Sequence, residues 1–183
     1  MKIKTKRLIL RPWENSDIES GVKNLNDLEV SKWLLVVPYP YTVKDAKEWV
    51  KRNKKKWAKK DKTDYTFGIE LREEKSIIGG IGLHHFDKRQ GTAEVGYWLG
   101  RNYHRKGYGS EALEAVIGFA FNKLKLRRLE ASVFSGNPSS GKLLEKFGFK
   151  LEGLKREARV SAAYSKVRDE LIYGLLKDDY TGR

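Results

Sequence analysis

The stretch that decides the fold is Glu94-Val-Gly-Tyr-Trp-Leu99, followed by Tyr103-His-Arg-Lys-Gly-Tyr-Gly-Ser110 and an apolar segment at residues 112–124. This order predicts a strand, a basic turn that contains glycine, and a long amphipathic helix. The first N–H groups of such a helix have no acceptor within the helix, and the helix dipole places partial positive charge beside them. The turn is therefore predicted to bind a phosphate group.

The glycines of this turn also allow other interpretations. Glycine opens many helices for steric reasons alone. The turn lacks the Gly-Lys-Ser/Thr of a Walker loop, and it lacks the third glycine and the following acidic residue of a dinucleotide site. Arg105 and Lys106 flank the amides and favour an anion. What remains is a pyrophosphate site of another type.

Length, composition and charge limit the classes of protein to which the chain can belong. Its 183 residues are 39% hydrophobic, which is enough for a sizeable core, and we expect one domain over residues 1–183. The absence of cysteine excludes a thiolate nucleophile and cysteine-rich zinc sites. No apolar run reaches about 18 residues and no leader pattern is present, so we expect a cytoplasmic protein without a membrane partner. The formal charge of +14 favours polyanionic partners, such as an acidic cofactor, RNA or a ribosome-like surface.

Strands and helices alternate along the chain. The predicted strands are residues 6–13, 65–72, 77–86, 92–99, 128–134, 149–157 and 163–176. The predicted helices are residues 14–34, with an interruption near Asn26-Asp27, and residues 43–60, 112–124 and 139–147. This order predicts the α/β class, with a twisted mixed sheet of about seven strands and helices on both faces.

Five motifs together resemble one known family. They are Arg7-Leu-Ile-Leu-Arg-Pro12, Ile78-Gly-Gly-Ile-Gly-Leu83, Ala93-Glu-Val-Gly-Tyr-Trp-Leu99, His104-x-x-Gly107-x-Gly109, and Asn137-Pro-Ser-Ser140 continuing to Leu144-Glu-Lys-Phe-Gly-Phe149. With them, residues 6–180 resemble a GNAT-superfamily N-acetyltransferase. Within that superfamily the chain is similar to the Rim-type branch, which acetylates the N-terminal alanine or serine of ribosomal proteins. The resemblance implies the GNAT acyl-CoA N-acyltransferase fold and acetyl-CoA as the co-substrate.

The resemblance also implies which residues bind acetyl-CoA. In the family, backbone amides of the turn hold the pyrophosphate, and here these belong to Arg105, Lys106, Gly107, Tyr108, Gly109 and Ser110. His104 stands where the family usually has Gln or Arg, so its own contact is open. The pantetheine arm would pair with the strand at Tyr97, Trp98 and Leu99. Gly96 within that strand fits either a bulge or a close approach of another backbone, and a bulge there would open the cleft.

Two residues of the later motif have both a binding and a structural interpretation. Asn137 either contacts the cofactor's arm, as in the family, or forms the turn before Pro138. Lys142, together with Lys146 one helical turn later, either reaches the 3′-phosphate of the cofactor or is simply exposed.

Acyl transfer to an amine requires a neutral amine, an acceptor for its proton and a group that stabilises the leaving thiolate. By resemblance, Glu94 occupies a position where several relatives place a general base; otherwise it is a surface charge paired with a lysine. Ser140 matches a serine that hydrogen-bonds the departing sulfur, or it only opens a helix. Many relatives have a tyrosine that acts as the general acid at the position of Leu144. Because leucine cannot donate a proton, Ser140 becomes the stronger candidate for stabilising the leaving sulfur. Glu157 is a second candidate base, ranked below Glu94 because residues 159–166 resemble a small insertion.

The chemistry of amines favours an N-terminal α-amine as the acceptor. At neutral pH a lysine costs roughly 3 kcal/mol more to deprotonate than an α-amine. Polyamines and aminoglycosides are polycations that a chain of charge +14 would repel. The sequence therefore predicts transfer to the N-terminus of a protein such as a ribosomal protein. The alternatives are a small-molecule amine acetyltransferase and a non-catalytic basic protein that binds RNA or the ribosome.

The remaining polar residues carry weaker predictions. The basic segment at residues 51–62 is either a solvated helix face or a contact with an acidic or ribosomal surface. A homodimer is compatible with the sequence. His84 and His85 are adjacent in a predicted strand, so their side chains should point to opposite faces, and we assign no metal site.

Overall fold

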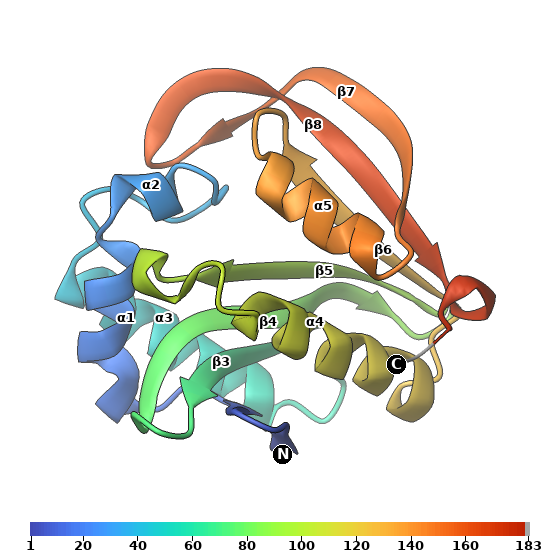
Figure 1. Cartoon of the computed structure of the whole chain (residues 1–183). Coiled ribbons are helices and arrows are strands. Elements are labelled where there is room, and N and C mark those ends of the chain that lie inside the picture. Colours follow the sequence, from blue (N-terminus) through green and yellow to red (C-terminus); the bar gives the residue numbers. More distant parts are fainter. Residues whose placement is uncertain (182–183) are drawn as a thin grey trace.

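Eight strands form one mixed sheet in the computed structural model, which describes residues 1–181 (Figure 1). The strand order is β1-β2-β3-β4-β5-β6-β8-β7, and every neighbouring pair is antiparallel except β5 and β6. The bounds are β1 Ile3–Lys4, β2 Leu8–Arg11, β3 Tyr65–Leu71, β4 Ser76–Asp87, β5 Thr92–Leu99, β6 Arg128–Phe134, β7 Lys150–Ser161 and β8 Tyr164–Leu176. The predicted α/β class and mixed sheet are confirmed.

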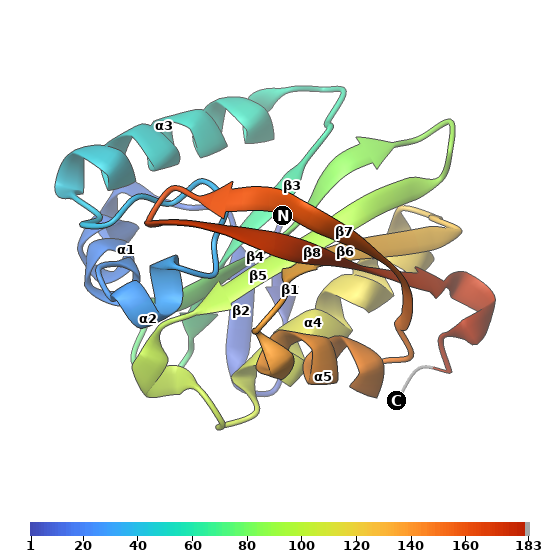
Figure 2. The ribbon, with the colours of Figure 1, turned by 90° about the horizontal axis from the view of Figure 1, so that it is seen from above.

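Helices cover both faces of the sheet, as predicted. They are α1 (Ile18–Leu25), α2 (Leu28–Ser31), α3 (Val43–Ala58), α4 (Tyr108–Gly118) and α5 (Pro138–Lys146). Figure 2 shows α1 and α3 on one side of the sheet and α4 and α5 on the other. The end of α4 continues as a π-helical turn over Phe119–Lys123. None of the helices within residues 1–181 combines the length and apolar character needed to cross a bilayer.

Local sequence explains where the helices on the first side begin and end. Thr42 and Asp45 form a capping box, in which each side chain bonds the other residue's backbone N–H, and this box starts α3. The predicted interruption lies between α1 and α2, where the Asp27 side chain accepts a hydrogen bond from the backbone N–H of Glu29. The helix predicted for residues 14–34 is therefore two short helices.

The main core lies between the sheet and α4. Strands β2, β3 and β4 contribute Leu8, Phe67 and Leu83, and α4 contributes Leu113 and Ile117, all at 0% exposure. On the other side, α3 buries Ala46, Val50 and Asn53 and exposes most of its lysines. This division of apolar and basic faces was visible in the helical periodicity.

The strand boundaries differ from the prediction in two places. The two-residue strand β1 raises the number of strands from about seven to eight. This strand is too short to show an alternation of apolar and polar residues, so no sequence pattern predicts it. Residues 159–166, which resemble an insertion in the sequence, instead belong to the long β7–β8 hairpin. The extra residues are absorbed where the register shifts between Lys155 and Arg159.

The predicted bulge at Gly96 is wrong, because Gly96 pairs regularly with Gly82 of β4. The irregularity lies in β4 itself, where the register shifts between His84 and Asp87 and His85 takes a φ of 51°. A bulge inserts residues into one strand and interrupts the alternation of its side chains. The assumption that His84 and His85 must point to opposite faces therefore does not hold at this position.

Candidate active site

The sheet branches between β5 and β6. These parallel strands pair only at Thr92, Ala93 and Glu94, although β5 continues to Leu99 and β6 to Phe134. Beyond Glu94, the edge of β5 that faces β6 thus has no sheet partner. Figure 1 shows the two halves of the sheet diverging from this point. Free backbone N–H and C=O groups on such an edge can pair with an extended ligand.

A second set of free backbone groups lies at the start of α4. Gly107 caps this helix with φ 81° and ψ 0°, and Arg105 has φ 59°. Within residues 1–181, the N–H groups of the residues from Gly107 to Ser110 have no acceptor in the protein. The helix dipole adds partial positive charge at this end. The turn is therefore arranged to bind an anion through its backbone, and a pyrophosphate fits it.

Arg7 holds this turn in place. Its Nη1 donates to the carbonyl oxygen of Lys106 at 2.9 Å, and its Nε donates to Glu111 Oε2 at 2.7 Å. Glu111 Oε1 also accepts from the backbone N–H of Arg7 and from the Thr5 hydroxyl, at 2.7 and 2.6 Å. The guanidinium stacks over Tyr108. Sequence reasoning gave Arg7 no site role; Glu111 in the first helical turn was the only local hint.

Removing the Arg7 guanidinium should loosen the turn. Arg7→Met deletes charge-assisted hydrogen bonds, so we expect the free energy of unfolding to fall by about 1–2 kcal/mol, the partial exposure of Arg7 moderating the loss. We also expect the Kd for coenzyme A to rise about tenfold, which corresponds to 1.4 kcal/mol. Urea unfolding and calorimetric titration measure the two effects. Lys6→Met, an exposed neighbour, is the control; unchanged affinity in Arg7→Met would contradict the assigned role.

Acid should weaken the same clamp. Burial raises the pKa of Glu111, but hydrogen bonds from Thr5 and Arg7 outweigh it and leave the pKa below its ordinary value of 4.5. A lowered pKa in the folded state gives stability that is present above the unfolded value and is lost as the pH falls through the folded one. The melting temperature of Glu111→Gln should therefore depend less steeply on pH below about 4.5 than that of the parent chain. Equal slopes would refute this.

The three predicted cofactor residues of β5 have different environments. Tyr97 Oη lies 2.9 Å from Ser140 Oγ and 3.2 Å from the Ser140 carbonyl oxygen, and its one proton can be donated to either of them. The indole of Trp98 stacks on Trp13 at 6.3 Å on the side of α1 and α3, so only its backbone can face the branch. Leu99 packs against Gly109, which links the end of β5 to the turn.

The hydrogen bond between Tyr97 and Ser140 bears on the predicted role of Ser140. Burial raises the pKa of Tyr97 to about 12, which keeps its hydroxyl protonated at neutral pH. Tyr97 can therefore donate to Ser140 Oγ and leave the serine proton available for another acceptor. A tyrosine thus reaches this helix from β5, whereas Leu144 is fully buried in the core.

The start of α5 confirms the structural interpretation of Asn137 and leaves its cofactor contact as a prediction. The Asn137 side chain caps the helix by accepting from the Ser140 N–H at 3.3 Å. Lys142 is exposed. Lys146 reaches back to the turn, where Nζ donates to Ser110 Oγ at 3.2 Å. The end of α5 is therefore joined to the start of α4.

Glu94 lies at the last paired position of the branch. Its side chain is 36% exposed, and Oε2 lies 4.0 Å from Nε2 of the exposed His85. Alternate residues of a strand share a face, so Glu94 lies on the same side as Trp98, toward α1 and α3. The turn before α4 lies on the opposite side (Figure 2). The branch can thus be approached by two reactants from two sides.

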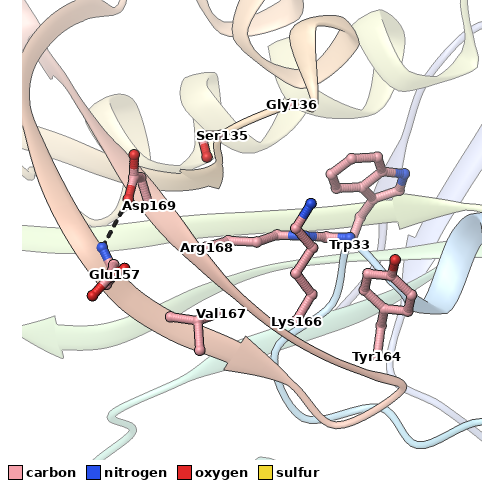
Figure 3. A pocket seen from close by; sticks show the side chains of 9 residues that line it. All are labelled: Trp33, Ser135, Gly136, Glu157, Tyr164, Lys166, Val167, Arg168 and Asp169. Atoms are coloured by element: carbon pink, nitrogen blue, oxygen red, sulfur yellow. Dashed lines mark hydrogen bonds between the residues drawn. The ribbon is translucent and has the colours of Figure 1, made fainter.

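Glu157 lies in a separate pocket of about 370 Å³ beside the β7–β8 hairpin (Figure 3). Its backbone N–H donates to Asp169 Oδ1 at 2.7 Å. Arg168 lies over the rings of Trp33 and Tyr164, with its Cζ atom 4.4 and 5.0 Å from their centroids. Glu94 is not among the residues that line this pocket. The other lining residues are Ser135, Gly136, Lys166 and Val167.

Within the described residues, no group of three His, Asp or Glu side chains is arranged to hold a metal ion.

Comparisons with known proteins agree with this geometry. Residues 7–150 match the family described as "Acetyltransferase (GNAT) domain". The chain is 34% identical over 178 residues to N-acetyltransferase p20 of Bacillus licheniformis, described as uncharacterized, with 97% of each chain covered. It is 33% identical over 96 residues to the ribosomal-protein-serine acetyltransferase of Escherichia coli, covering 52% of this chain and 54% of the other. A GNAT-family acetyltransferase structure from Bacillus anthracis superposes with a TM-score of 0.81 at 27% identity, covering 97% and 99%.

Proposed function

The chain belongs to the GNAT family of N-acetyltransferases, and on this premise we propose that it transfers the acetyl group of acetyl-CoA to the N-terminal α-amine of a protein, with a ribosomal protein as the leading substrate. The family uses acetyl-CoA. The observation that carries the proposal is the branch after Glu94, which lies between a turn of free amides on one side and the half-buried Glu94 carboxylate on the other. We take residues 1–183 to act as one domain, because all eight strands join one sheet.

In this proposal the turn before α4 binds the diphosphate of acetyl-CoA. The amides of the residues from Arg105 to Ser110 supply the hydrogen bonds, and Arg105 and Lys106 supply positive charge. The pantetheine arm extends along the free edge of β5, with the backbone of Tyr97, Trp98 and Leu99 as partners. Asn137 borders the arm from the start of α5, and Lys142 is placed on the exposed side of that helix to meet the 3′-phosphate.

Glu94 then provides the base on the acceptor side, acting on the amine directly or through water. The neutral amine attacks the thioester carbon, the N–C bond forms and the C–S bond breaks. Ser140 donates its hydroxyl proton as a hydrogen bond to the departing sulfur, supported by Tyr97 behind it. The separation of Glu157 from Glu94 favours a role for Glu157 in binding the acceptor, as the second and lower-ranked base candidate.

The charges of the pocket beside β8 favour a peptide over a polyamine. Glu157 and Asp169 are balanced by Lys166 and Arg168, so the pocket offers no excess of negative charge to a polycation. Trp33 and Tyr164 give it an apolar, aromatic wall suited to a peptide chain. The relative from Escherichia coli acetylates a ribosomal protein by its name. The exposed lysines of α3 supply a basic surface for an acidic or ribosomal partner.

Glu94→Gln tests the proposed chemistry, with Glu130→Gln as its control. Glu130 pairs with Glu94 across the same branch point but lies on β6 and is bound by Arg128 at 2.9 Å. In assays with acetyl-CoA and synthetic peptides that begin with Ala, Ser or Met, we expect Glu94→Gln to lower kcat about 100-fold. Glu130→Gln should stay within about twofold of the parent rate. Mass spectrometry should locate the acetyl group on the peptide's α-amine.

Two results would contradict the proposal. Acetylation of free polyamines in preference to every peptide would favour the small-molecule alternative. Tight RNA binding without measurable affinity for acetyl-CoA would favour a non-catalytic role.

A further inference from the structure

An aspartate and a histidine from distant parts of the chain meet beside Glu94. Nδ1 of His84 lies 3.2 Å from Oδ1 of Asp64, in the loop between α3 and β3. Asp64 is itself held at Oδ2 by Lys56 Nζ at 3.1 Å and by the Thr63 hydroxyl at 3.0 Å. The carboxylate is thus fixed on three sides. It selects the imidazole form that carries its proton on Nδ1, which leaves Nε2 as a free acceptor.

The free nitrogen of His84 lies on the acceptor side of the sheet. His84 and Glu94 are direct partners in the β4–β5 register, so their side chains share a face about 5 Å apart at Cβ. The imidazole covers two glycines: Nε2 lies 3.3 Å from the place of a Cβ on Gly82 and 3.7 Å from that on Gly96. A Cβ on Gly82 would be in tight contact with the ring, and a Cβ on Gly96 would be in ordinary van der Waals contact with it. Gly96 is on the free part of β5, just beyond the branch point.

We propose that His84 is a further catalytic residue: its Nε2 accepts the proton of the acceptor amine, with Asp64 as the group that orients it and Glu94 as the carboxylate that holds the ammonium group. This inference rests on the proposed function. An imidazole is closer in proton affinity to an α-amine than a carboxylate is, so it is the better matched base near neutral pH. The proton is then removed by His84 and Glu94 acting together, rather than by Glu94 alone.

The proton balance of the step is complete without another reactant. The ammonium group loses one proton to Nε2, and the neutral nitrogen attacks the thioester carbon. The N–C bond forms, the C–S bond breaks, and the sulfur leaves with the electron pair as a thiolate. The second proton of the amine passes to the thiolate, and His84 returns the first to solvent. Asp64 and Glu94 stabilise the imidazolium between these steps.

His84→Gln and Asp64→Asn test the proposal, with Asp61→Asn as the control. Asp61 is an exposed aspartate in the same loop as Asp64. With the peptides described above, we expect His84→Gln to lower kcat at least about 30-fold with little change in KM, and Asp64→Asn about tenfold. Asp61→Asn should keep the parent kcat within about twofold.

The pH profile separates catalysis from support of the fold. The groups that face the His84 ring are Asp64, Glu94, His85 and, through Asp64, Lys56. The parent chain should gain activity as the pH rises, because the base must be unprotonated to accept the proton of the amine. His84→Gln should lose this part of the pH profile, and Asp61→Asn should keep it. Added imidazole should restore part of the activity of His84→Ala, which a purely structural role would not allow.

Nitrogen NMR gives a readout that needs no acceptor. In the neutral imidazole of His84, the proton should reside on Nδ1 and Nε2 should be unprotonated. A proton on Nε2 would overturn the proposal, as would an unchanged kcat and pH profile in His84→Gln. If the parent chain acetylates no amine at all, the proposed function itself fails, and the role of His84 fails with it.

Discussion

Replacement of Gly107 by valine is expected to raise the Kd for coenzyme A at least about 100-fold, which corresponds to roughly 3 kcal/mol of binding free energy. Gly107 has a φ of 81°, in the left-handed region that costs an L-residue about 1–2 kcal/mol and suits a β-branched residue least. A Cβ here would also lie 3.2 Å from Nη2 of Arg7. The new side chain would displace the guanidinium that holds the Lys106 carbonyl. The backbone N–H groups of the turn would then no longer point toward one bound diphosphate.

Calorimetric titration with coenzyme A measures this effect, and Gly118→Ala is the control in the same helix. A Cβ on Gly118 would meet only Asn122 Nδ2 at 4.0 Å, and the φ of Gly118 is −58°. This change should keep the parent Kd. If Gly107→Val bound coenzyme A as tightly as Gly118→Ala, the turn would not be the diphosphate site.

Arg11→Met should be the most destabilising single substitution we consider. Arg11 is 7% exposed, and its Nη1 and Nη2 each donate to Asp17 at 2.8 Å while Nε donates to Glu70. Without the guanidinium, the carboxylates of Asp17, just before α1, and of Glu70, on β3, remain without this counter-charge. Breaking a buried ion pair in this way costs about 3–5 kcal/mol. For a chain of this size, the melting temperature should fall by about 10 °C.

Two measurements on Arg11→Met identify why it loses stability: the pH dependence of its free energy of unfolding, and the stability of a variant in which the two carboxylates are also neutralised. Lowering the pH should shrink the deficit of Arg11→Met, because protonation removes the charges left without a partner. The triple variant Arg11→Met, Asp17→Asn, Glu70→Gln should be more stable than the single variant at neutral pH. Urea unfolding is the measurement. A single variant that stays within 1 kcal/mol of the parent chain would refute the account of this cluster.

Much of the fold could be predicted because local sequence and tertiary packing favour the same structure. Thr42 and Asp45 mark the start of α3, and its apolar spacing matches the residues it buries. Strands β3 to β6 were placed within one or two residues. The bulge in β4 could not be predicted, because the residues from His84 to Asp87 include no glycine and the bulge arises from how β4 pairs with β5. The long β7 strand is mostly exposed, so it lacks the alternation that would have shown its full length.

The candidate site was predictable only where its residues are close in sequence. The turn from Arg105 to Ser110 and the start of α5 each lie in one short motif. The clamp between Arg7 and Glu111 joins residues 104 positions apart, and His84 and Asp64 are 20 apart. No spacing rule connects such residues. The side chain of Trp98 points away from the branch because Trp13 packs against it, a partner that the sequence does not reveal.

A crystal structure of the chain with coenzyme A tests the central claim most directly. The account predicts that diphosphate oxygens accept hydrogen bonds of about 3 Å from the backbone N–H groups of Gly107, Gly109 and Ser110. The pantetheine arm should lie along β5 beyond Glu94, with its sulfur next to Ser140. Coenzyme A bound elsewhere, such as in the pocket of Trp33 and Arg168, with the amides of this turn left free, would contradict it.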